Sequence, residues 1–370
     1  MKILWISGSQ IVGGGERAQH QLSQLFRRRG HSVEVLCPRK STLREVLLQD
    51  GFRVHPFPIR GSFNPCVAVN ISKVITRVRP SIAVVTTPHE WVWTGLSVHP
   101  SSARLVFVRR MALPLPRPVL WLANQRAHAI VACSEAVRQV LLDDGTIPAS
   151  RVHVIHDPVR FPARAKPPTH EERGRARASL NIPQSGLWVG FFGGLKEVKG
   201  IGDVVRAVRK ATIHLGQIHL LVCGPIRGEG RPVEYWAEQL GEEGHLHHLG
   251  EIPPHLVSKA MTAVDVVVVA THNRLKEALS LVLIEAMACG TPVTAYATGG
   301  IPEAVGLSRE AGLLAKADDP NSLSACLVEV LSDPDLAQRL SAGGLNRVKE
   351  HFDSDSLANR YETLFRRLTA

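Results

Sequence analysis

Short apolar runs alternate with amphipathic stretches along the first part of the chain. The runs KILWIS (2–7) and HSVEVLC (31–37) have the composition of buried parallel strands, and residues 16–30 between them carry apolar side chains at helical spacing. Strand patterns that run into further polar or helical stretches follow at 81–91 and 128–145. This order of strand, helix and strand predicts a doubly wound α/β fold on a parallel sheet.

The same pattern resumes after a break. Residues 160–170, RFPARAKPPTH, are rich in proline and basic side chains without periodicity, which predicts a linker. Beyond it, 187–194 and 264–270 are apolar strand patterns, and the final segments are amphipathic helices. The sequence therefore predicts two domains, residues 1–165 and residues 166–353.

Composition is that of an ordinary globular protein. With 370 residues, 44% hydrophobic and 21% charged, the chain is long enough for two cores and too apolar to be disordered. No apolar run approaches the roughly 20 residues that span a bilayer, and the start, MKILWISGS, meets Gly and Ser too early for a secretory signal. The six cysteines are scattered, without C-x-x-C spacing, and are predicted to be reduced core residues. We expect a cytoplasmic protein.

Positive charge is concentrated in the first half. Residues 1–165 carry 22 Lys and Arg against 9 Asp and Glu, a net charge of +13, whereas the remaining 205 residues carry 22 against 24, a net charge of −2. A first half with this positive charge suits an anionic partner, such as a lipid-linked phosphate or the inner face of the cytoplasmic membrane. A need for solubility would also explain it. The arginines accompany no nucleic-acid-binding motif, so no nucleic-acid partner is expected.

The stretch at 274–305 carries the clearest candidate chemistry. It contains Glu277 and Glu285, and the pattern between them predicts a loop that becomes a helix at Ser280 and ends at Gly290. Unpaired backbone N–H groups and the helix dipole favour an anion at such a helix start. The predicted phosphate-binding positions are Ser280, Leu281 and Val282.

The two acids suit a polyhydroxyl ligand beside that phosphate. A carboxylate accepts two hydrogen bonds from vicinal hydroxyls, so Glu285 is predicted to bind a ribose and Glu277 a sugar on the other side of the phosphates. We expect no metal ion and no cofactor in this arrangement.

Two features of the first half bear on other chemistry. The glycines at 13–15 do not meet the spacing G-x-G-x-x-G, and the second strand ends without an acid, which argues against a dinucleotide site. His89 follows an apolar strand, where open α/β sheets bind ligands, so it is a candidate reactive residue. A structural or solvated histidine remains the alternative.

Glu277, Glu285 and the runs EAMACGTPV (285–293) and GGIPE (299–303) resemble the motifs of the retaining glycosyltransferases of family 4. The resemblance covers nearly the whole chain. It implies the α/β fold called GT-B, in which two doubly wound Rossmann-like domains face each other across a cleft, with the donor on the second domain and the acceptor on the first. It also implies that a C-terminal helix, at about 354–370, packs back on the first domain.

The resemblance assigns roles to further residues. Together with the helix start at Ser280, and with Lys196 as a substitute for a missing arginine, it gives as donor-binding residues Gly14, Gly15, Gly193, Lys196, Lys199, Ile252, Glu277, Ser280, Leu281, Val282 and Glu285. The acceptor-binding residues it implies are Arg17, Arg109 and Arg110. The candidate catalytic residues are Lys199 and Glu277 from the resemblance and His89 from its position after a strand. The chain departs from the family pattern at Gly194, where an arginine is usual, and at Ala278-Leu279-Ser280, where Gly-Phe-Gly is usual.

These implications lead to one expected function and two alternatives. We expect an enzyme that moves a sugar from a nucleotide diphosphate sugar to a hydroxyl of a glycan or lipid-linked acceptor, with retention, in the synthesis of cell-envelope polysaccharide, lipopolysaccharide or glycolipid. The first alternative is a non-catalytic subunit that binds nucleotide sugar and assists another transferase. The second is another GT-B enzyme, such as a nucleotide-sugar epimerase.

Overall fold

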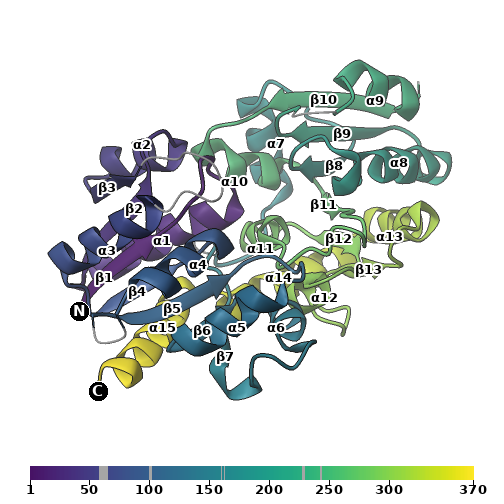
Figure 1. Ribbon diagram of the computed structural model, residues 1–370. Coiled ribbons are helices and arrows are strands. Elements are labelled where there is room, and N and C mark those ends of the chain that lie inside the picture. The colour runs from purple at the N-terminus through teal and green to yellow at the C-terminus, as the bar shows by residue number, and fades with distance from the viewer. Residues whose placement is uncertain (58–65, 100–101, 160, 162, 227–229, 242–243) are drawn as a thin grey trace. The chain divides into compact units, whose positions relative to one another are not determined.

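The computed structural model describes all residues except 58–65, 100–101, 160, 162, 227–229 and 242–243, so two positions of the predicted linker lie outside the described residues. The chain divides into two compact units (Figure 1). Unit 1 comprises Met1–Arg160 and Ser354–Ala370, and unit 2 comprises Phe161–Asp353. The sequence predicts the division between residues 165 and 166.

Unit 1 is built on a seven-stranded parallel sheet with the strand order β3-β2-β1-β4-β5-β6-β7. Its strands are β1 (Lys2–Ile6), β2 (Ser32–Pro38), β3 (Arg53–Phe57), β4 (Ile82–Val85), β5 (Arg104–Arg109), β6 (Ala129–Ala132) and β7 (Val152–Val154). The four residues from Ile3 to Ile6 are all buried, so both faces of β1 are covered, as in other doubly wound sheets. The predicted α/β class is confirmed for this unit.

The helices of unit 1 connect successive strands, as parallel pairing requires, except α15, which returns to this unit after unit 2. They are α1 (Gly14–Arg28), α2 (Thr42–Gln49), α3 (Cys66–Val78), α4 (Pro88–Ser97), α5 (Arg117–Arg126), α6 (Glu135–Leu142), the short turn η1 (Ala149–Arg151) and the C-terminal α15 (Ser354–Thr369).

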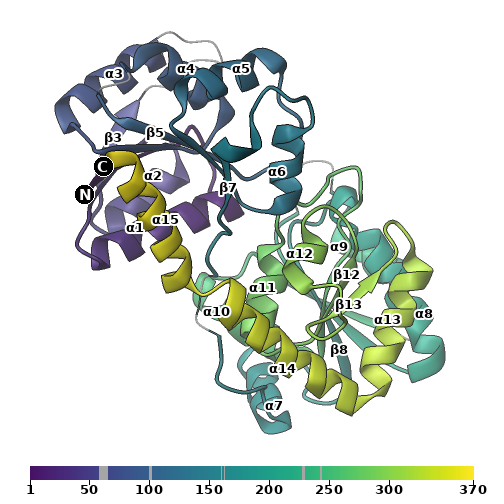
Figure 2. The ribbon, with the colours of Figure 1, turned by 90° about the horizontal axis from the view of Figure 1, so that it is seen from below.

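Helix α15 belongs to the core of unit 1 although it ends the chain. Figure 2 shows it beside α1, and the two helices are in contact. The ring of Phe26 lies 6.2 Å from that of Tyr361 and 5.8 Å from that of Phe365. Beside these rings, Nε of Arg29 lies 2.9 Å from a carboxylate oxygen of Glu362. Apolar packing and an ion pair therefore both hold α15 on unit 1.

Unit 2 repeats the architecture on a six-stranded parallel sheet with the order β10-β9-β8-β11-β12-β13. The strands are β8 (Leu187–Phe192), β9 (Ile218–Cys223), β10 (Gly244–Gly250), β11 (Val266–Val269), β12 (Val293–Tyr296) and β13 (Leu313–Ala315). The helices are α7 (His170–Ser179), η2 (Glu197–Lys199), α8 (Ile201–Leu215), α9 (Val233–Leu240), α10 (Pro254–Ala263), α11 (Leu281–Ala288), α12 (Ile301–Val305), α13 (Pro320–Ser332) and α14 (Pro334–His351).

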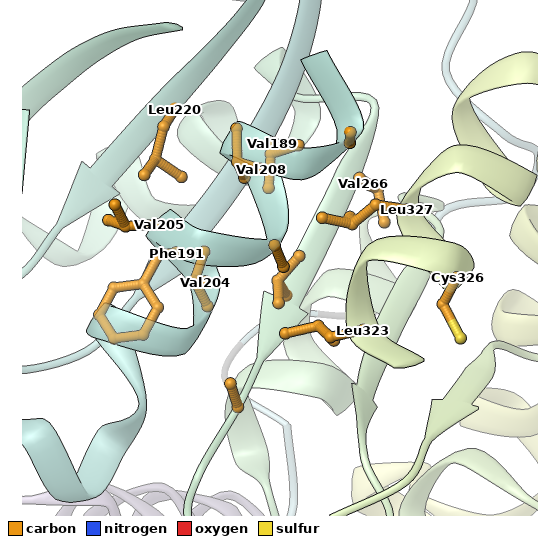
Figure 3. Close-up of a cluster of buried hydrophobic side chains, with 14 of the residues drawn as sticks. Val189, Phe191, Val204, Val205, Val208, Leu220, Val266, Leu323, Cys326 and Leu327 are labelled. Atoms are coloured by element: carbon orange, nitrogen blue, oxygen red, sulfur yellow. The ribbon is translucent and has the colours of Figure 1, made fainter. Parts of the chain in front are cut away.

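The core of unit 2 lies where α8 and α13 pack on the sheet. Figure 3 shows Val204 and Val208 of α8, Leu323 and Leu327 of α13, and Val266 of β11 in one cluster. All five side chains are fully buried, and each contributes about 1.5–3 kcal/mol of hydrophobic stabilisation. This packing holds β8 and β11 in place in the sheet.

Among the described residues, no helix has both the length and the hydrophobicity needed to cross a bilayer.

Candidate functional site

The strand order of unit 2 changes direction between β8 and β11. In open α/β sheets, ligands bind at such a switch point, beside the carboxyl ends of the strands. The loops that leave β8, β11 and the neighbouring β12 carry Lys199, Glu277 and Gly299, respectively. The candidate site of unit 2 is therefore built from three adjacent strand ends.

Two glycines allow these loops to touch. Gly200 has a φ of +76°, and an added Cβ would lie 1.9 Å from the carbonyl oxygen of Ala270. Gly299 has a φ of +52°, and its Cβ would lie 2.1 Å from the carbonyl oxygen of Glu277. That oxygen accepts a hydrogen bond of 2.7 Å from the backbone N–H of Gly300. Glycine suits both places because it tolerates positive φ and lets two backbones approach closely.

Lys199 and Glu277 form an ion pair at the centre of this site. The Nζ atom of Lys199 is 2.8 Å from Oε2 of Glu277, and the hydroxyl of Thr271 donates to the same oxygen at 2.8 Å. The lysine side chain is 36% exposed and that of the glutamate 19%, whereas Thr271 is buried. The structure thus brings together two of the predicted catalytic residues, and the third, His89, lies in unit 1.

Helix α11 follows Glu277 in the same loop. As predicted, the helix starts directly after Ser280, and Gly290, with a φ of +69°, lies just beyond its end. The Ser280 hydroxyl makes no capping hydrogen bond. Leu281 and Val282 are half-buried in the first turn, and Glu285 is buried in the second. The N-terminus of α11 therefore offers backbone N–H groups and a favourable dipole to an anion.

A buried network lies behind the ion pair. The carboxylate of Asp203, in the first turn of α8, accepts a hydrogen bond of 2.7 Å from the hydroxyl of Tyr296, and Nε2 of His272 is 3.2 Å from the same oxygen. The backbone N–H of His272 donates to the carbonyl oxygen of Val198 at 3.1 Å. Burial, together with Asp203, raises the pKa of Tyr296, which keeps its hydroxyl a donor. This network fixes η2, which carries Lys199, against the loop after β11.

The other predicted donor residues of unit 2 share this edge of the sheet. Gly193 follows β8, and its N–H donates to the carbonyl oxygen of Cys223 at 2.9 Å. Lys196 is exposed just before η2, and Ile252 is half-buried between β10 and α10. Their contacts with a donor stay predictions.

The strand order of unit 1 changes direction between β1 and β4, which makes a second switch point. Helix α1 starts beyond β1 with Gly14 and Gly15, and it carries the exposed Arg17 in its first turn. Helix α4 starts beyond β4, and His89 is exposed in its first turn. Four of the predicted residues therefore lie in loops and helix starts beside one switch point.

Arg109 and Arg110 are largely enclosed. The Nε atom of Arg110 is 2.8 Å from a carboxylate oxygen of Asp157, and although burial disfavours its charge, Asp157 keeps its pKa above the ordinary value. Arg109 donates to the carbonyl oxygen of Leu113 at 2.8 Å, and burial lowers its pKa. A Cβ at Gly15 would lie 3.1 Å from Cδ of Arg110. These contacts give both arginines a packing role, and their action on an acceptor stays a prediction.

Sequence reasoning missed an acid next to His89. Glu90 is 7% exposed, and burial raises the pKa of its carboxyl although a hydrogen bond from Thr87 opposes this effect. The signal was present in the sequence, because Glu90 belongs to the polar run that leaves the apolar strand β4.

Two further observations bear on unit 2. Within the part of the chain that the structure describes, no group of three or more His, Cys, Asp or Glu side chains is arranged to hold a metal ion.

A pocket of about 620 Å³, lined by Arg164, Glu172 and Cys289 among others, lies at the opposite end of α11 from Ser280. This pocket is therefore separate from the site around Lys199.

Comparison with known proteins covers both units. A family model described as "Glycosyl transferases group 1" matches residues 172–347, and one described as "Glycosyltransferase Family 4" matches residues 12–160. The chain belongs to the family 4 glycosyltransferases. The first match contains the whole site around Lys199, and the second contains the predicted residues of unit 1.

Curated relatives match part of the chain. A D-inositol 3-phosphate glycosyltransferase of Corynebacterium jeikeium is 34% identical over 179 residues, which are 47% of this chain and 42% of that protein. Another, from Mycolicibacterium gilvum, is 31% identical over 216 residues, which are 56% of this chain and 46% of that protein. The match spans less than half the length of each of these relatives.

Solved structures of glycosyltransferase size and fold resemble the chain over nearly its full length. HepE of Anabaena, in complex with UDP, has a TM-score of 0.85 at 22% identity and covers 98% of this chain and 99% of its own. The lipopolysaccharide outer core galactosyltransferase WaaB, in its apo form, has a TM-score of 0.75 at 15% identity and covers 99% of this chain and 100% of its own. At these identities the likeness shows the fold, and the predicted GT-B class is confirmed.

Proposed function

We propose that this family 4 glycosyltransferase transfers a hexosyl-type sugar from a nucleoside diphosphate sugar to a hydroxyl of an acceptor, with retention at the anomeric carbon. The observation that carries the proposal is the pairing of Lys199 with Glu277 at the switch point of unit 2, beside the N-terminus of α11. A cation, a carboxylate and a helix start in one loop cluster suit a diphosphate joined to a sugar.

Lys199 and α11 act on the leaving diphosphate in this proposal. Negative charge grows on that group as its bond to the sugar breaks, and preorganised positive groups stabilise it most at that moment. The ammonium of Lys199 and the N–H groups at Ser280 to Val282 supply this charge, with Lys196 as a second cation. Because the contacts of Lys199 with Glu277 already hold it at the site, little reorganisation is needed when the donor binds.

The two acids bind the hydroxyl-bearing ends of the donor. Glu277, oriented by Thr271, holds the transferred sugar, and Glu285 accepts hydrogen bonds from the ribose. Gly14, Gly15 and Gly193 leave room for the phosphates, and Ile252 contacts the base. The attack is on one face of the sugar, near His89, with no nucleophile assigned, no metal ion and no cofactor.

UDP is the first nucleotide to test, because HepE was solved with UDP. The basic charge of residues 1–165 supports an acceptor that carries phosphate, bound with the help of Arg17, Arg109 and Arg110. The names of the curated relatives make an inositol phosphate one such acceptor to test. A lipid-linked acceptor at the inner face of the cytoplasmic membrane, in envelope polysaccharide, lipopolysaccharide or glycolipid synthesis, is the other.

The test is a thermal-shift screen with UDP, GDP, ADP and CMP and their sugars, repeated on Glu285→Ala. A nucleotide at 100 times its Kd stabilises by about 2.7 kcal/mol, which raises the melting temperature by about 5–10 °C for a unit of this size. Glu329→Ala, an acid of unit 2 paired with Arg309 on the surface, is the matched control.

Each outcome of the screen decides something. A shift with one nucleotide, lost in Glu285→Ala and kept in Glu329→Ala, supports the donor site and names the base. Release of that nucleotide from its sugar, faster with the acceptor than without it, then supports transfer. Binding without turnover would favour a non-catalytic subunit, and no shift with any nucleotide would refute the proposal.

A further inference from the structure

Glu90 occupies the switch point of unit 1. It lies in the first turn of α4, the helix that follows β4, and its carboxyl reaches across to Gly8, the second residue after the end of β1. An added Cβ on Gly8 would lie 2.2 Å from Oε1 of Glu90 and 2.4 Å from both Cδ and Oε2. The carboxyl therefore lies directly against the backbone of Gly8, in the space that any other residue at position 8 would fill.

Thr87 joins these two elements. Its hydroxyl donates to Oε2 of Glu90 and accepts a hydrogen bond of 3.0 Å from the backbone N–H of Gly8. The chain of contacts thus runs from the backbone after β1, through one hydroxyl, to a carboxyl that is 7% exposed.

A plain helix cap does not account for this arrangement. The order Thr87-Pro88-His89-Glu90 fits the capping box, in which the threonine hydroxyl accepts from a backbone N–H of the first helical turn. Here the Thr87 side chain makes no capping bond to α4, and its hydrogen bonds go to Gly8 and Glu90 instead. Thr87 and Glu90 stand at the positions of a capping box, but their contacts link the loop after β4 to the loop after β1.

We propose that Glu90 is a positioning residue for the transfer reaction, an inference that rests on the proposed function. Through Thr87 it fixes the turn at Gly8 against the first turn of α4. That turn leads into the loop before Gly14 and Gly15, and the first turn of α4 carries His89. Glu90 therefore sets the spacing between the glycine-containing start of α1 and His89.

The burial of the Glu90 carboxyl agrees with this role. A buried carboxylate is costly unless a cation or several donors compensate it. Burial raises the pKa of Glu90, while the hydrogen bond from Thr87 and the proximity of His89 oppose that effect. Keeping such a group beside a switch point is typical of functional rather than purely structural acids.

The first experiment measures amide hydrogen exchange of Gly8, which needs no substrate. Glu90→Met, which keeps the length of the side chain but accepts no hydrogen bond from Thr87, should raise exchange at Gly8 at least tenfold. Thr87→Val should do the same. Glu90→Gln keeps one oxygen that can accept from Thr87, and Thr87→Ser keeps the hydroxyl, so both variants should keep at least half of the protection. Unchanged exchange in Glu90→Met would overturn the inference whether or not the protein turns over a donor.

The second experiment separates positioning from folding through the kinetics of donor turnover. Glu90→Met should lower kcat at least tenfold and change the donor KM by a smaller factor, because the donor-binding residues Lys199, Glu277 and Glu285 of unit 2 are untouched. Glu34→Gln, a buried acid on β2 that pairs with His55, is the control and should change kcat less than twofold. Equal losses in Glu90→Met and Glu34→Gln would show a merely structural role.

The two proposals fail in different ways. If wild type turns over the donor and Glu90→Met stays within twofold of it, the inference on Glu90 is refuted and the proposed function stands. If wild type binds no nucleotide at all, the proposed function is refuted, and the role of Glu90 in the reaction falls with it.

Discussion

Replacing Gly299 by alanine should disturb the site around Glu277 more than its size implies. The residue has a φ of +52°, and the added Cβ would lie 2.1 Å from the carbonyl oxygen of Glu277. The left-handed conformation costs alanine about 1–2 kcal/mol. Relieving the contact moves the Glu277 carbonyl away from the N–H of Gly300, which loses a hydrogen bond worth about 1 kcal/mol. The expected loss is about 2–3 kcal/mol.

The assay is a thermal melt of Gly299→Ala beside Gly51→Ala. Gly51 follows the C-terminus of α2 with a φ of +70°, and a Cβ added there would meet no atom within 4 Å, so its substitution carries the conformational cost without the clash. At about 2–4 °C per kcal/mol for a unit of this size, Gly299→Ala should melt about 5–10 °C lower than wild type. It should also weaken the nucleotide-induced shift, because Glu277 moves away from Lys199. A melting temperature no lower than that of Gly51→Ala would refute the argument that close contact fixes this loop.

Three further substitutions test other parts of the molecule. Lys199→Ala should lower kcat about 100-fold, as for the loss of one preorganised charge-stabilising group, with little change in melting temperature because the pair is partly exposed; a loss under threefold in steady-state turnover would contradict this. Glu362→Gln should flatten the pH dependence of stability in urea titrations. Burial alone would raise the pKa of Glu362, but the hydrogen bond with His31 contributes to holding that pKa below 4.5. The ionised carboxylate therefore stabilises wild type, and this stabilisation is lost as pH falls through the folded-state pKa. A parallel acid dependence in both proteins would argue against that. Tyr296→Phe should cost about 1–2 kcal/mol because Asp203 loses a buried hydrogen bond, and an unchanged urea midpoint would exclude it.

The repeating elements of the fold were predictable because they depend on local patterns. The helix expected from Ser280 to Gly290 is observed at Leu281–Ala288. It was predictable because the apolar spacing and the glycine that ends it are both features of neighbouring residues. The parallel sheets follow from apolar runs separated by helices. The roles assigned to the predicted site residues rest on motif resemblance and remain to be measured.

The contacts that shape the candidate sites were not predictable in the same way. The ion pair of Arg110 with Asp157 joins residues 47 apart, and the bond of Tyr296 to Asp203 joins residues 93 apart. No periodicity encodes such pairs, because they depend on which strand ends become neighbours. The place of Glu90 after an apolar strand was visible in the sequence, but its contact with Gly8 was not, because Gly8 follows a strand that is adjacent in the sheet and distant in the sequence.

The place of α15 has a consequence for how the protein is made. Unit 1 contains the first and the last residues of the chain, while unit 2 is one continuous stretch. During synthesis, β1 to β7 leave the ribosome long before Tyr361 and Phe365 are added. Phe26, which packs against these two residues, therefore lacks their cover while unit 2 emerges and folds. Unit 1 is therefore translated first but completed last. We expect chaperones that bind nascent apolar surface to act on α1 of unit 1 rather than on unit 2.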